Sequence, residues 1–396
     1  MTLELLYKVF LMSSKMKVLQ VIPKLGYGGA ETGCYDLAHY LSENGCKSYI
    51  ITSGGELLKY VKKEKVRVIR LPVHSKNPLV ILINAIIIFF IIWLLNISIV
   101  HARSRAPAWS CLIASKFTRA KFVTTFHGTY NFSNLLKKFY NSIMVRSDLV
   151  IGGSNFIFEH VYQNYAEFFE ENKRKFLVIF RGINTEYFNQ KNVRKNKLQN
   201  FIKIWNIDKS KSVILLPGRL TQWKGQELFI EALSILKYKP ETKPFSAIIL
   251  GSDQGRKVYK KKLLSLVDRY RLNKNLIFIP NCKEMPIAYH LSDIIVSASI
   301  EPEAFGRVSV EAQSMEKPII ASNIGGSKET IINEKTGFLF ESGNANALAE
   351  KLNELLNLDQ LTLQSMGIEG RKNVLKKFDI ERMCFSTFSE YKKLLK

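Results

Sequence analysis

Cysteine and histidine are scarce in this sequence of 396 residues, which has five cysteines and six histidines. The cysteines are odd in number and form no CxxC pair, and the histidines form no HExxH motif. We therefore expect neither structural disulfides nor a metal site, and the cysteine usage fits a reducing, cytoplasmic compartment. No resident cofactor is predicted.

Acidic residues are also few, because 34 Asp and Glu face 58 Lys and Arg, for a net charge of +24. The excess is uneven, with +16 in residues 1–200 and +8 in the remainder. A basic surface of this kind predicts an anionic partner, which can be a nucleic acid, an acidic membrane or a phosphorylated substrate. The basic residues do not interleave with aromatics in a recognisable RNA-binding motif, so no nucleic-acid partner is predicted.

Only one long apolar run exists, at residues 79–95 (LVILINAIIIFFIIWLL), which is 17 residues long and uncharged. A membrane-spanning helix usually needs about 20 residues. A strand-like segment follows directly, which favours a buried or interfacial helix over a span. With nearby Lys and Arg, the run also suits peripheral contact with an anionic membrane, at the inner face of the cytoplasmic membrane.

Short apolar segments alternate with helical ones, which predicts parallel sheets covered by helices on both faces. The expected strands are residues 18–22, 48–52, 66–71, 97–101, 122–126, 149–152, 176–180, 212–216, 246–250, 276–279, 294–296, 318–321 and 337–340. The length of the chain points to two domains.

We predict an α/β fold of two Rossmann-like, doubly wound domains, at residues 16–190 and 201–375, followed by a C-terminal helix at 376–396. The polar stretch 189–200 (QKNVRKNKLQN after Asn189) is interpreted as a linker between the domains. Residues 1–15 make a poor signal peptide and are interpreted as an extension or a misassigned start.

A glycine-containing loop follows the first expected strand. Gly28 and Gly29 stand between a strand and a helix, where backbone amides can approach an anion. The dinucleotide fingerprint GxGxxG is not met, because Glu31 stands at its third glycine, and a nicotinamide cofactor is disfavoured. The loop is either an anion site or merely a tight turn.

Two cations follow the first strand of the second half, in the segment LPGRLTQWKG at residues 216–225. Arg219 and Lys224 can converge on one anion, for which a diphosphate is the obvious match. The alternative is that both are solvated surface cations.

Two carboxylates lie in the segment SIEPEAFGRVSVEA at residues 299–312. Glu303 falls in a loop and Glu311 in the helix after it, and eight helical residues span about 12 Å. The two side chains are expected to contact different parts of one elongated ligand through its hydroxyl groups. A double-displacement glycosidase pair would need carboxyls about 5–5.5 Å apart, which this placement does not favour. The alternative is a capping Glu and a solvated Glu.

The ordered set of these elements resembles the family-four retaining glycosyltransferases of GT-B fold, of bacterial glycan or lipopolysaccharide type. The set comprises the cationic loop, the E-x7-E element from Glu303 to Glu311, and SNIGGSKE at residues 322–329. The similarity covers about residues 16–380. It implies two domains facing across a cleft and a last helix that returns to the N-terminal domain.

The resemblance also implies roles for the residues of the second half. Arg219 and Lys224 would bind the diphosphate of a UDP- or GDP-hexose donor, Glu303 the hydroxyls of the transferred hexose, and Glu311 those of the ribose. Backbone amides near the hexose would come from Phe305 and Gly306.

In the N-terminal half, the same resemblance implies that Gly28 and Gly29 lie near the phosphates and the acceptor. It makes His127, in the segment TFHGT, the active-site histidine. We assign Arg103 and Arg105 to an anionic acceptor.

The predicted function is therefore retaining transfer of a hexose to a glycan or lipid-linked acceptor, in lipopolysaccharide or cell-surface polysaccharide synthesis. The family implies front-face attack, and Arg219, Lys224 and helix-terminal amides can stabilise the departing diphosphate without a metal. Two alternatives remain: a sugar-nucleotide epimerase of the same fold, and a non-catalytic, membrane-associated binding protein.

Overall fold

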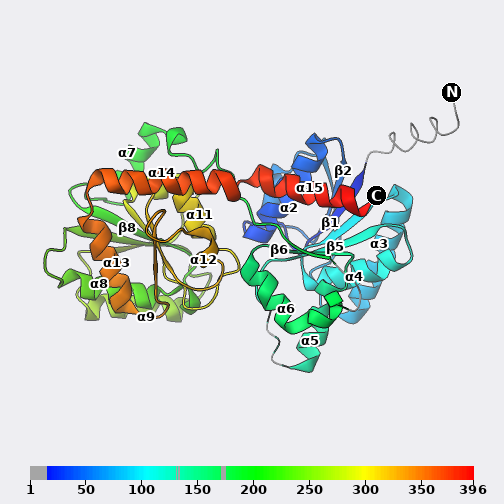
Figure 1. Ribbon diagram of the computed structural model, residues 1–396, viewed down its shortest axis with the longest axis horizontal. Coiled ribbons are helices and arrows are strands. Elements are labelled where there is room, and N and C mark those ends of the chain that lie inside the picture. Colours follow the sequence, from blue (N-terminus) through cyan, green and yellow to red (C-terminus); the bar gives the residue numbers. More distant parts are fainter. Residues whose placement is uncertain (1–15, 131, 133, 171–174) are drawn as a thin grey trace. The chain divides into compact units, whose positions relative to one another are not determined.

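The structure, a computed structural model, describes residues 16–130, 132, 134–170 and 175–396, and it divides into two compact units (Figure 1). The first unit ends at Gly182 and also includes Ile380–Lys396, and the second unit is Ile183–Asp379. The proposed extension at residues 1–15 lies outside the described residues.

The first unit contains a seven-stranded sheet in the order β3-β2-β1-β4-β5-β6-β7, and every pairing in it is parallel. Its strands are β1 (Lys17–Val21), β2 (Lys47–Thr52), β3 (Val66–Arg70), β4 (Ile99–Ala102), β5 (Lys121–Phe126), β6 (Leu149–Gly152) and β7 (Lys175–Val178). Its helices are α2 (Gly29–Glu43), η1 (Glu56–Tyr60), α3 (Pro78–Leu95), α4 (Arg105–Lys116), α5 (Leu135–Ser142), η2 (Ile143–Val145), α6 (Asn155–Glu170) and α15 (Ile380–Leu394).

The second unit contains a six-stranded parallel sheet in the order β10-β9-β8-β11-β12-β13. Its strands are β8 (Ser212–Pro217), β9 (Phe245–Leu250), β10 (Leu276–Ile279), β11 (Ile294–Ser297), β12 (Ile319–Ser322) and β13 (Phe338–Phe340). Its helices are η3 (Gln190–Asn192), α7 (Lys195–Ile204), η4 (Gln222–Lys224), α8 (Gln226–Lys237), α9 (Lys257–Arg269), α10 (Met285–Leu291), α11 (Arg307–Ser314), α12 (Ser327–Thr330), α13 (Ala345–Asn357) and α14 (Gln360–Lys377).

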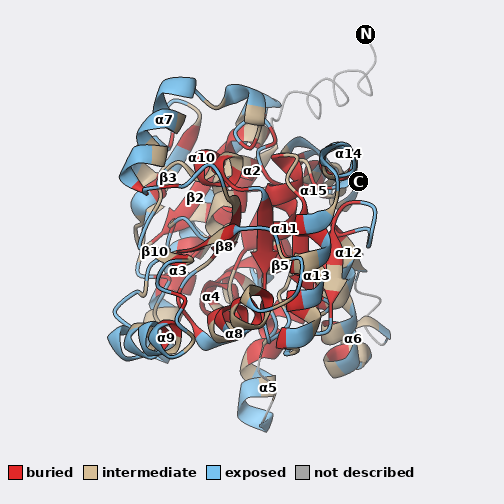
Figure 2. Ribbon diagram, turned by 90° about the vertical axis from the view of Figure 1, so that its left-hand side faces the viewer, coloured by how far each residue is buried: buried red, intermediate tan, exposed pale blue. Residues whose placement is uncertain are grey.

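The strands are short apolar runs buried over most of their length, as parallel sheets with helices on both faces require. In β8, for example, the sequence SVILLP is buried from its second residue onward. Figure 2 shows the strands as buried and the outer faces of the helices as exposed. Each of the thirteen expected segments overlaps one observed strand, so the predicted pattern of strands is confirmed.

The last helix, α15, belongs to the first unit and packs against α2. Phe388 meets Tyr40 of α2 edge to face, with ring centroids 6.3 Å apart. Tyr391 is fully buried, and its hydroxyl lies 2.5 Å from Nδ1 of His101 on β4. The C-terminus therefore completes the core of the first unit.

The interpretation of residues 189–200 as a linker is wrong. This stretch contains η3 and the start of α7 inside the second unit. Lys197 of α7 forms an ion pair of 2.6 Å with Glu284, and Phe201 meets Trp205 edge to face. Its polar residues are the solvent face of an amphipathic helix, which resembles a linker in composition alone.

The apolar run is helix α3, but it is not a core helix. Only 22% of it is buried, and its fully covered positions are Asn84, Ala85, Ile88 and Ile92. Among the described residues, α3 alone is long and apolar enough to cross a membrane. The expectation of a buried helix is thus correct for one face only.

The order of strands reverses once in each sheet, between β1 and β4 and between β8 and β11. In open α/β sheets, ligands bind beyond the carboxyl ends of the strands at such a reversal. A ligand site is therefore expected at the loops that follow β1, β4, β8 and β11.

Candidate active site

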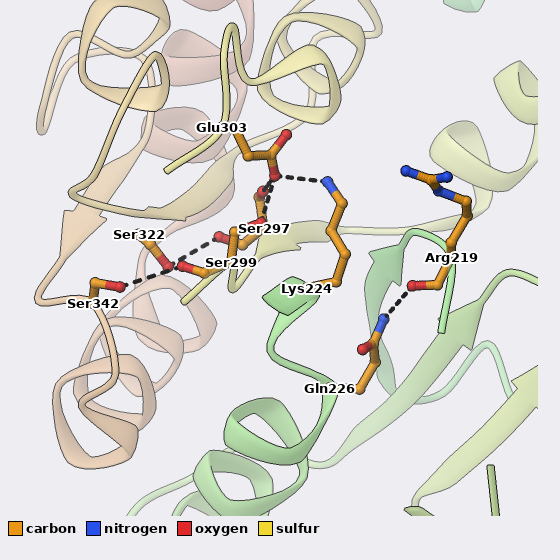
Figure 3. A network of polar contacts seen from close by, with 8 residues as sticks. All are labelled: Arg219, Lys224, Gln226, Ser297, Ser299, Glu303, Ser322 and Ser342. Atoms are coloured by element: carbon orange, nitrogen blue, oxygen red, sulfur yellow. Dashed lines mark hydrogen bonds and ion pairs between the residues drawn. The ribbon is translucent and has the colours of Figure 1, made fainter. Parts of the chain in front are cut away.

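Lys224 and Glu303 meet at the reversal point of the second sheet. Lys224 follows β8 in η4, Glu303 follows β11, and Nζ of Lys224 lies 2.7 Å from Oε1 of Glu303 (Figure 3). The two side chains are only 14% and 10% exposed. The ammonium group also lies 4.4 Å from the ring centroid of Trp223. This is an ordered ion pair shielded from water, which has a stronger field than a surface pair.

Serine hydroxyls hold the Glu303 carboxylate in place. Ser299 donates to Oε1 at 2.5 Å, and Ser297 lies 3.5 Å from the same oxygen. The carbonyls of these two serines accept hydrogen bonds from Ser342 and Ser322, as Figure 3 shows. Sequence reasoning missed these serines, although Ser299 stands only four residues before Glu303.

The glycine pair Gly325 and Gly326 packs directly against the loop that carries Glu303. Gly325 has a φ of 59°, and a Cβ there would lie 2.6 Å from the Glu303 carbonyl oxygen. The Gly326 amide donates to that carbonyl at 2.7 Å, and a Cβ on Gly326 would lie 2.7 Å from Cα of Phe305. Only glycine permits this approach, which explains the two glycines of SNIGGSKE.

Glu311 is buried on α11 and has two partners. The Tyr289 hydroxyl donates to Oε2 at 2.8 Å, and Nε of Arg307 lies 2.6 Å from Oε1. Burial and the Glu311 charge hold the pKa of Tyr289 well above its usual range, so this phenol stays a donor. Tyr289 was not foreseen, because it lies 22 residues from Glu311 with no local pattern to connect them.

Arg219 does not join the ion pair. Its side chain is exposed, and its guanidinium forms no hydrogen bond or ion pair with any residue that the structure describes. Its carbonyl accepts from Nε2 of Gln226 at 2.9 Å, which fixes the loop after β8. Gly306, with a φ of 82°, is the N-cap of α11, and Phe305 packs against Phe378 with ring centroids 5.6 Å apart.

The first unit gathers a second set of groups at the start of α2 and the end of β5. Gly28 is the N-cap of α2, and the Arg181 guanidinium donates to the carbonyl of Gly29. Both ring nitrogens of His127 are buried without a hydrogen-bond partner among the described residues. Burial, with Arg181 and Arg103 nearby, holds the pKa of His127 well below its usual range. His127 is thus a neutral imidazole whose donor and acceptor have no partner among the described residues, so both are available to water or a ligand.

Arg103 and Arg105 differ in their surroundings. Arg103 is buried, and its Nε donates to Oε1 of Gln20 at 2.8 Å. Arg105 stacks over the ring of Tyr130 at 4.2 Å and donates to Asn141 at 2.8 Å. Arg105 is therefore held by local contacts, and its assignment to an anionic acceptor stays a prediction, whereas Arg103 is a cation near His127 whose described hydrogen-bond partner is neutral.

Comparison with known proteins identifies the family to which this chain belongs. Residues 27–187 match the model of Glycosyltransferase Family 4, and residues 198–373 match that of Glycosyl transferases group 1. A crystal structure of a glycosyltransferase from Rickettsia africae ESF-5 is 40% identical, with a TM-score of 0.88, over 97% of this chain and 99% of that one. The chain belongs to the glycosyltransferases.

Two further relatives of this glycosyltransferase have lower sequence identity. The capsular polysaccharide biosynthesis glycosyltransferase CapM of Staphylococcus aureus is 30% identical over 54% of this chain and 53% of its own. The chain thus spans about half the length of the curated relatives it matches. HepE of Anabaena, solved with UDP-glucose, is 21% identical with a TM-score of 0.77 over 95% of this chain and 100% of that one, which shows a shared fold. The two parallel-sheet units are those of a GT-B glycosyltransferase.

Proposed function

We propose that this glycosyltransferase transfers a hexose from a nucleoside diphosphate sugar, with retention of configuration, to a glycan or lipid-linked acceptor. The acceptor belongs to the synthesis of lipopolysaccharide or another cell-surface polysaccharide. The observation that carries the proposal is the shielded pair of Lys224 and Glu303 at the reversal point of the second sheet. The name of CapM, a capsular polysaccharide enzyme, supports the class of acceptor.

The donor diphosphate is assigned to Lys224 and Arg219. Lys224 already has an ordered position through Glu303 and Trp223, so little reorganisation is needed when a phosphate arrives. Arg219 has an exposed guanidinium that pairs with no described residue, and such a fork matches phosphate oxygens. Together they stabilise the negative charge that develops on the departing diphosphate, without a metal.

The two carboxylates are assigned to the two sugars of the donor. Among the described residues, the hydrogen-bond partners of Glu303 all contact Oε1, so Oε2 can accept from hexose hydroxyls. Glu311 receives one bond at each oxygen, and each oxygen has a second lone pair for a ribose hydroxyl. The amides of Phe305 and Gly306 stand at the N-terminal end of α11, which favours negative charge.

The first unit is assigned to the hexose and the acceptor. His127 offers a neutral imidazole whose two nitrogens have no described partner, and a sugar hydroxyl satisfies both the donor and the acceptor of such a ring. Gly28 and Gly29 stand at the start of α2, and a helix N-terminus favours a phosphate or another anionic oxygen. Arg103 is suited to an anionic group on the acceptor.

A donor panel tests the proposal. The full chain is titrated with UDP-glucose, UDP-galactose, UDP-N-acetylglucosamine and GDP-mannose, and binding and slow hydrolysis are measured. We expect one donor to bind clearly better and to be hydrolysed to a sugar that first emerges in the donor's anomeric form, as followed by NMR. Binding of none of the four, or release of an epimerised free sugar, contradicts the proposal.

A further inference from the structure

Helix α3 carries apolar side chains on two opposite faces. One face, which includes Ala85, Ile88 and Ile92, is buried, and the helix packs on α4. The other, which we call the outer face, exposes large side chains at helical spacing, among them Leu79, Ile83, Ile86, Phe90, Trp93 and Leu94. Each of these six is between 49% and 70% exposed. Isolated exposed apolar residues are ordinary, but a continuous face of them marks an interaction surface.

The topology prevents α3 from crossing a bilayer. A single crossing would put the chain before and after the helix on opposite sides of the membrane. Yet β3 and β4, which flank α3, are strands of one sheet. Hydrogen bonds also hold α3 to this unit, from Ser110 to the carbonyl of Ile81 at 2.9 Å and from Lys17 to that of Leu95 at 2.8 Å. The helix therefore lies along the surface of the unit.

The segment of the chain that contains α3 carries charge of one sign only. Residues 65–147 contain 12 Lys and Arg and no Asp or Glu over 83 positions. This segment includes α3, α4, which packs against α3, and α5. Lys76 is exposed just before α3, and Lys116 and Arg119 are exposed at the end of α4, on either side of Phe117, which is 75% exposed. Such a surface attracts anionic lipid and repels a second copy of itself.

We propose that the outer face of α3 inserts into one leaflet of an anionic lipid bilayer, with the helix axis in the membrane plane. A helix of 18 residues is about 27 Å long, so it can submerge its apolar face along that length at the boundary between headgroups and acyl chains. Exposed basic residues of the segment, namely Lys76, Lys116 and Arg119, then lie at the level of the phosphates. Membrane insertion would bring the enzyme to a lipid-linked acceptor. The biological role of the insertion therefore rests on the proposed function, but the insertion itself does not.

Co-sedimentation of the full chain with vesicles tests the proposal. Vesicles of phosphatidylglycerol and phosphatidylcholine in equal parts are compared with vesicles of phosphatidylcholine alone. We expect binding to the anionic vesicles that weakens as salt is added, and much weaker binding to the neutral ones. Equal binding to both, or to neither, overturns the proposal.

A matched pair of variants separates the outer face from general hydrophobicity. Ile83→Gln with Ile86→Gln changes exposed positions of α3, and Val258→Gln with Leu361→Gln changes exposed positions on α9 and at α14. None of the four removes a buried contact, so the fold is expected to persist. We expect the α3 variant to bind anionic vesicles at least about tenfold more weakly, and the control to bind as the unchanged chain does. An equal effect of both pairs contradicts the assignment to α3.

Fluorescence reports the insertion directly, because Trp93 is 66% exposed on the outer face. Its emission should shift to shorter wavelength on anionic vesicles, and the shift should be lost in Trp93→Phe. Sedimentation equilibrium without lipid tests whether a second copy of the chain, instead of a membrane, covers the outer face. A dimer that the α3 variant dissociates, without vesicle binding, would show that a second copy covers this face and would overturn the proposal.

These measurements need no donor, and the donor panel needs no lipid. Failure of the membrane proposal can thus be told apart from failure of the proposed function.

Discussion

Nζ of Lys224 and Oε1 of Glu303 lie 2.7 Å apart although 79 residues separate them in the chain. The loops after β8 and β11 bring them together because these strands are neighbours in the sheet. Removing either partner leaves the other charge partly buried and uncompensated. The proposed donor site is therefore also a structural unit, and its variants need controls for stability.

Loss of the donor cations should slow transfer. Arg219→Ala and Lys224→Ala are each expected to raise the barrier by roughly 2–4 kcal/mol, the scale of a lost preorganised charge contact. The measurement is kcat/KM with the preferred donor, together with Tm. Lys262→Ala is the control, because Lys262 forms an exposed pair with Glu227 that contributes little. Near-normal activity in both Arg219→Ala and Lys224→Ala would remove the diphosphate assignment.

Glu311→Gln should mainly weaken donor binding, because it removes the charged acceptor assigned to the ribose. Tyr289→Phe keeps that carboxylate but deletes the hydrogen bond of 2.8 Å that orients it. Its loss of donor affinity should be smaller, about 1 kcal/mol. Calorimetric titration measures both. Unchanged donor affinity in Glu311→Gln speaks against the ribose role.

The close approach at Gly325 can be separated from its backbone conformation. Gly325→Ala and Gly343→Ala both place alanine at a positive φ, 59° and 81°, which costs about 1 kcal/mol. Only at Gly325 would the new Cβ meet the Glu303 backbone, since nothing lies within 4 Å of that position at Gly343. We expect Gly325→Ala to lower both Tm and kcat, and Gly343→Ala to lower Tm slightly and leave kcat unchanged. Equal effects on kcat would disprove the packing argument.

Stability should fall as the solution becomes acidic through the histidine range. Burial holds the pKa values of His101 and His127 well below their usual range, so both stay neutral when folded. Unfolded histidine takes up a proton near pH 6.5. The stability from neutral histidine is thus present above about pH 6.5 and is lost as the pH falls from there toward the folded values. The slope is up to about 1.4 kcal/mol per pH unit for each histidine.

Thermal unfolding between about pH 7.5 and about pH 5.5 measures this loss. In His101→Gln, Tm should be lower at the start, since contacts with Tyr391 and Thr125 are weakened, but its fall with pH should be shallower. An identical slope in the variant would show that His101 does not contribute.

Chelation tests the proposed metal-free stabilisation of the leaving diphosphate. Transfer should persist in excess EDTA, because Arg219 and Lys224 are assigned the charge that a metal supplies elsewhere. Rescue by added Mg²⁺ after a loss in EDTA would contradict this assignment. Arg219→Ala in the same buffers shows whether the metal substitutes for the missing guanidinium.

The alternation of apolar runs with helical segments predicted the strands of both sheets correctly. A strand buried on both faces, such as β8, is recognisable from composition alone. The stretch at 189–200 misled because a solvent-facing helix and a linker have the same polar composition, and only its ion pair and ring contacts distinguish them. For α3, composition indicated an apolar helix. Composition did not show that only one face would be buried, because that depends on where α4 packs.

For the candidate site, the sequence predicted which residues take part better than it predicted the contacts between them. Glu303 and Glu311 stood out through their spacing, and Lys224 through the loop that carries it. The contacts of Ser299, Tyr289 and Gly325 were not predicted. Ser299 contacts Glu303 through the turn of their shared loop, whereas Tyr289 and Gly325 contact Glu311 and Glu303 from other segments of the chain.

The amino-acid sequence by itself determined the alternating strands and helices, the excess of basic charge and the kinds of chemical group available at each strand end, because these depend on local pattern and composition. The tertiary structure alone decided that Lys224 pairs with Glu303, that the ring nitrogens of His127 are buried, and that one face of α3 stays uncovered. Pairing, desolvation and coverage depend on which segments the order of strands brings together, and that order arises from contacts between residues far apart in the chain.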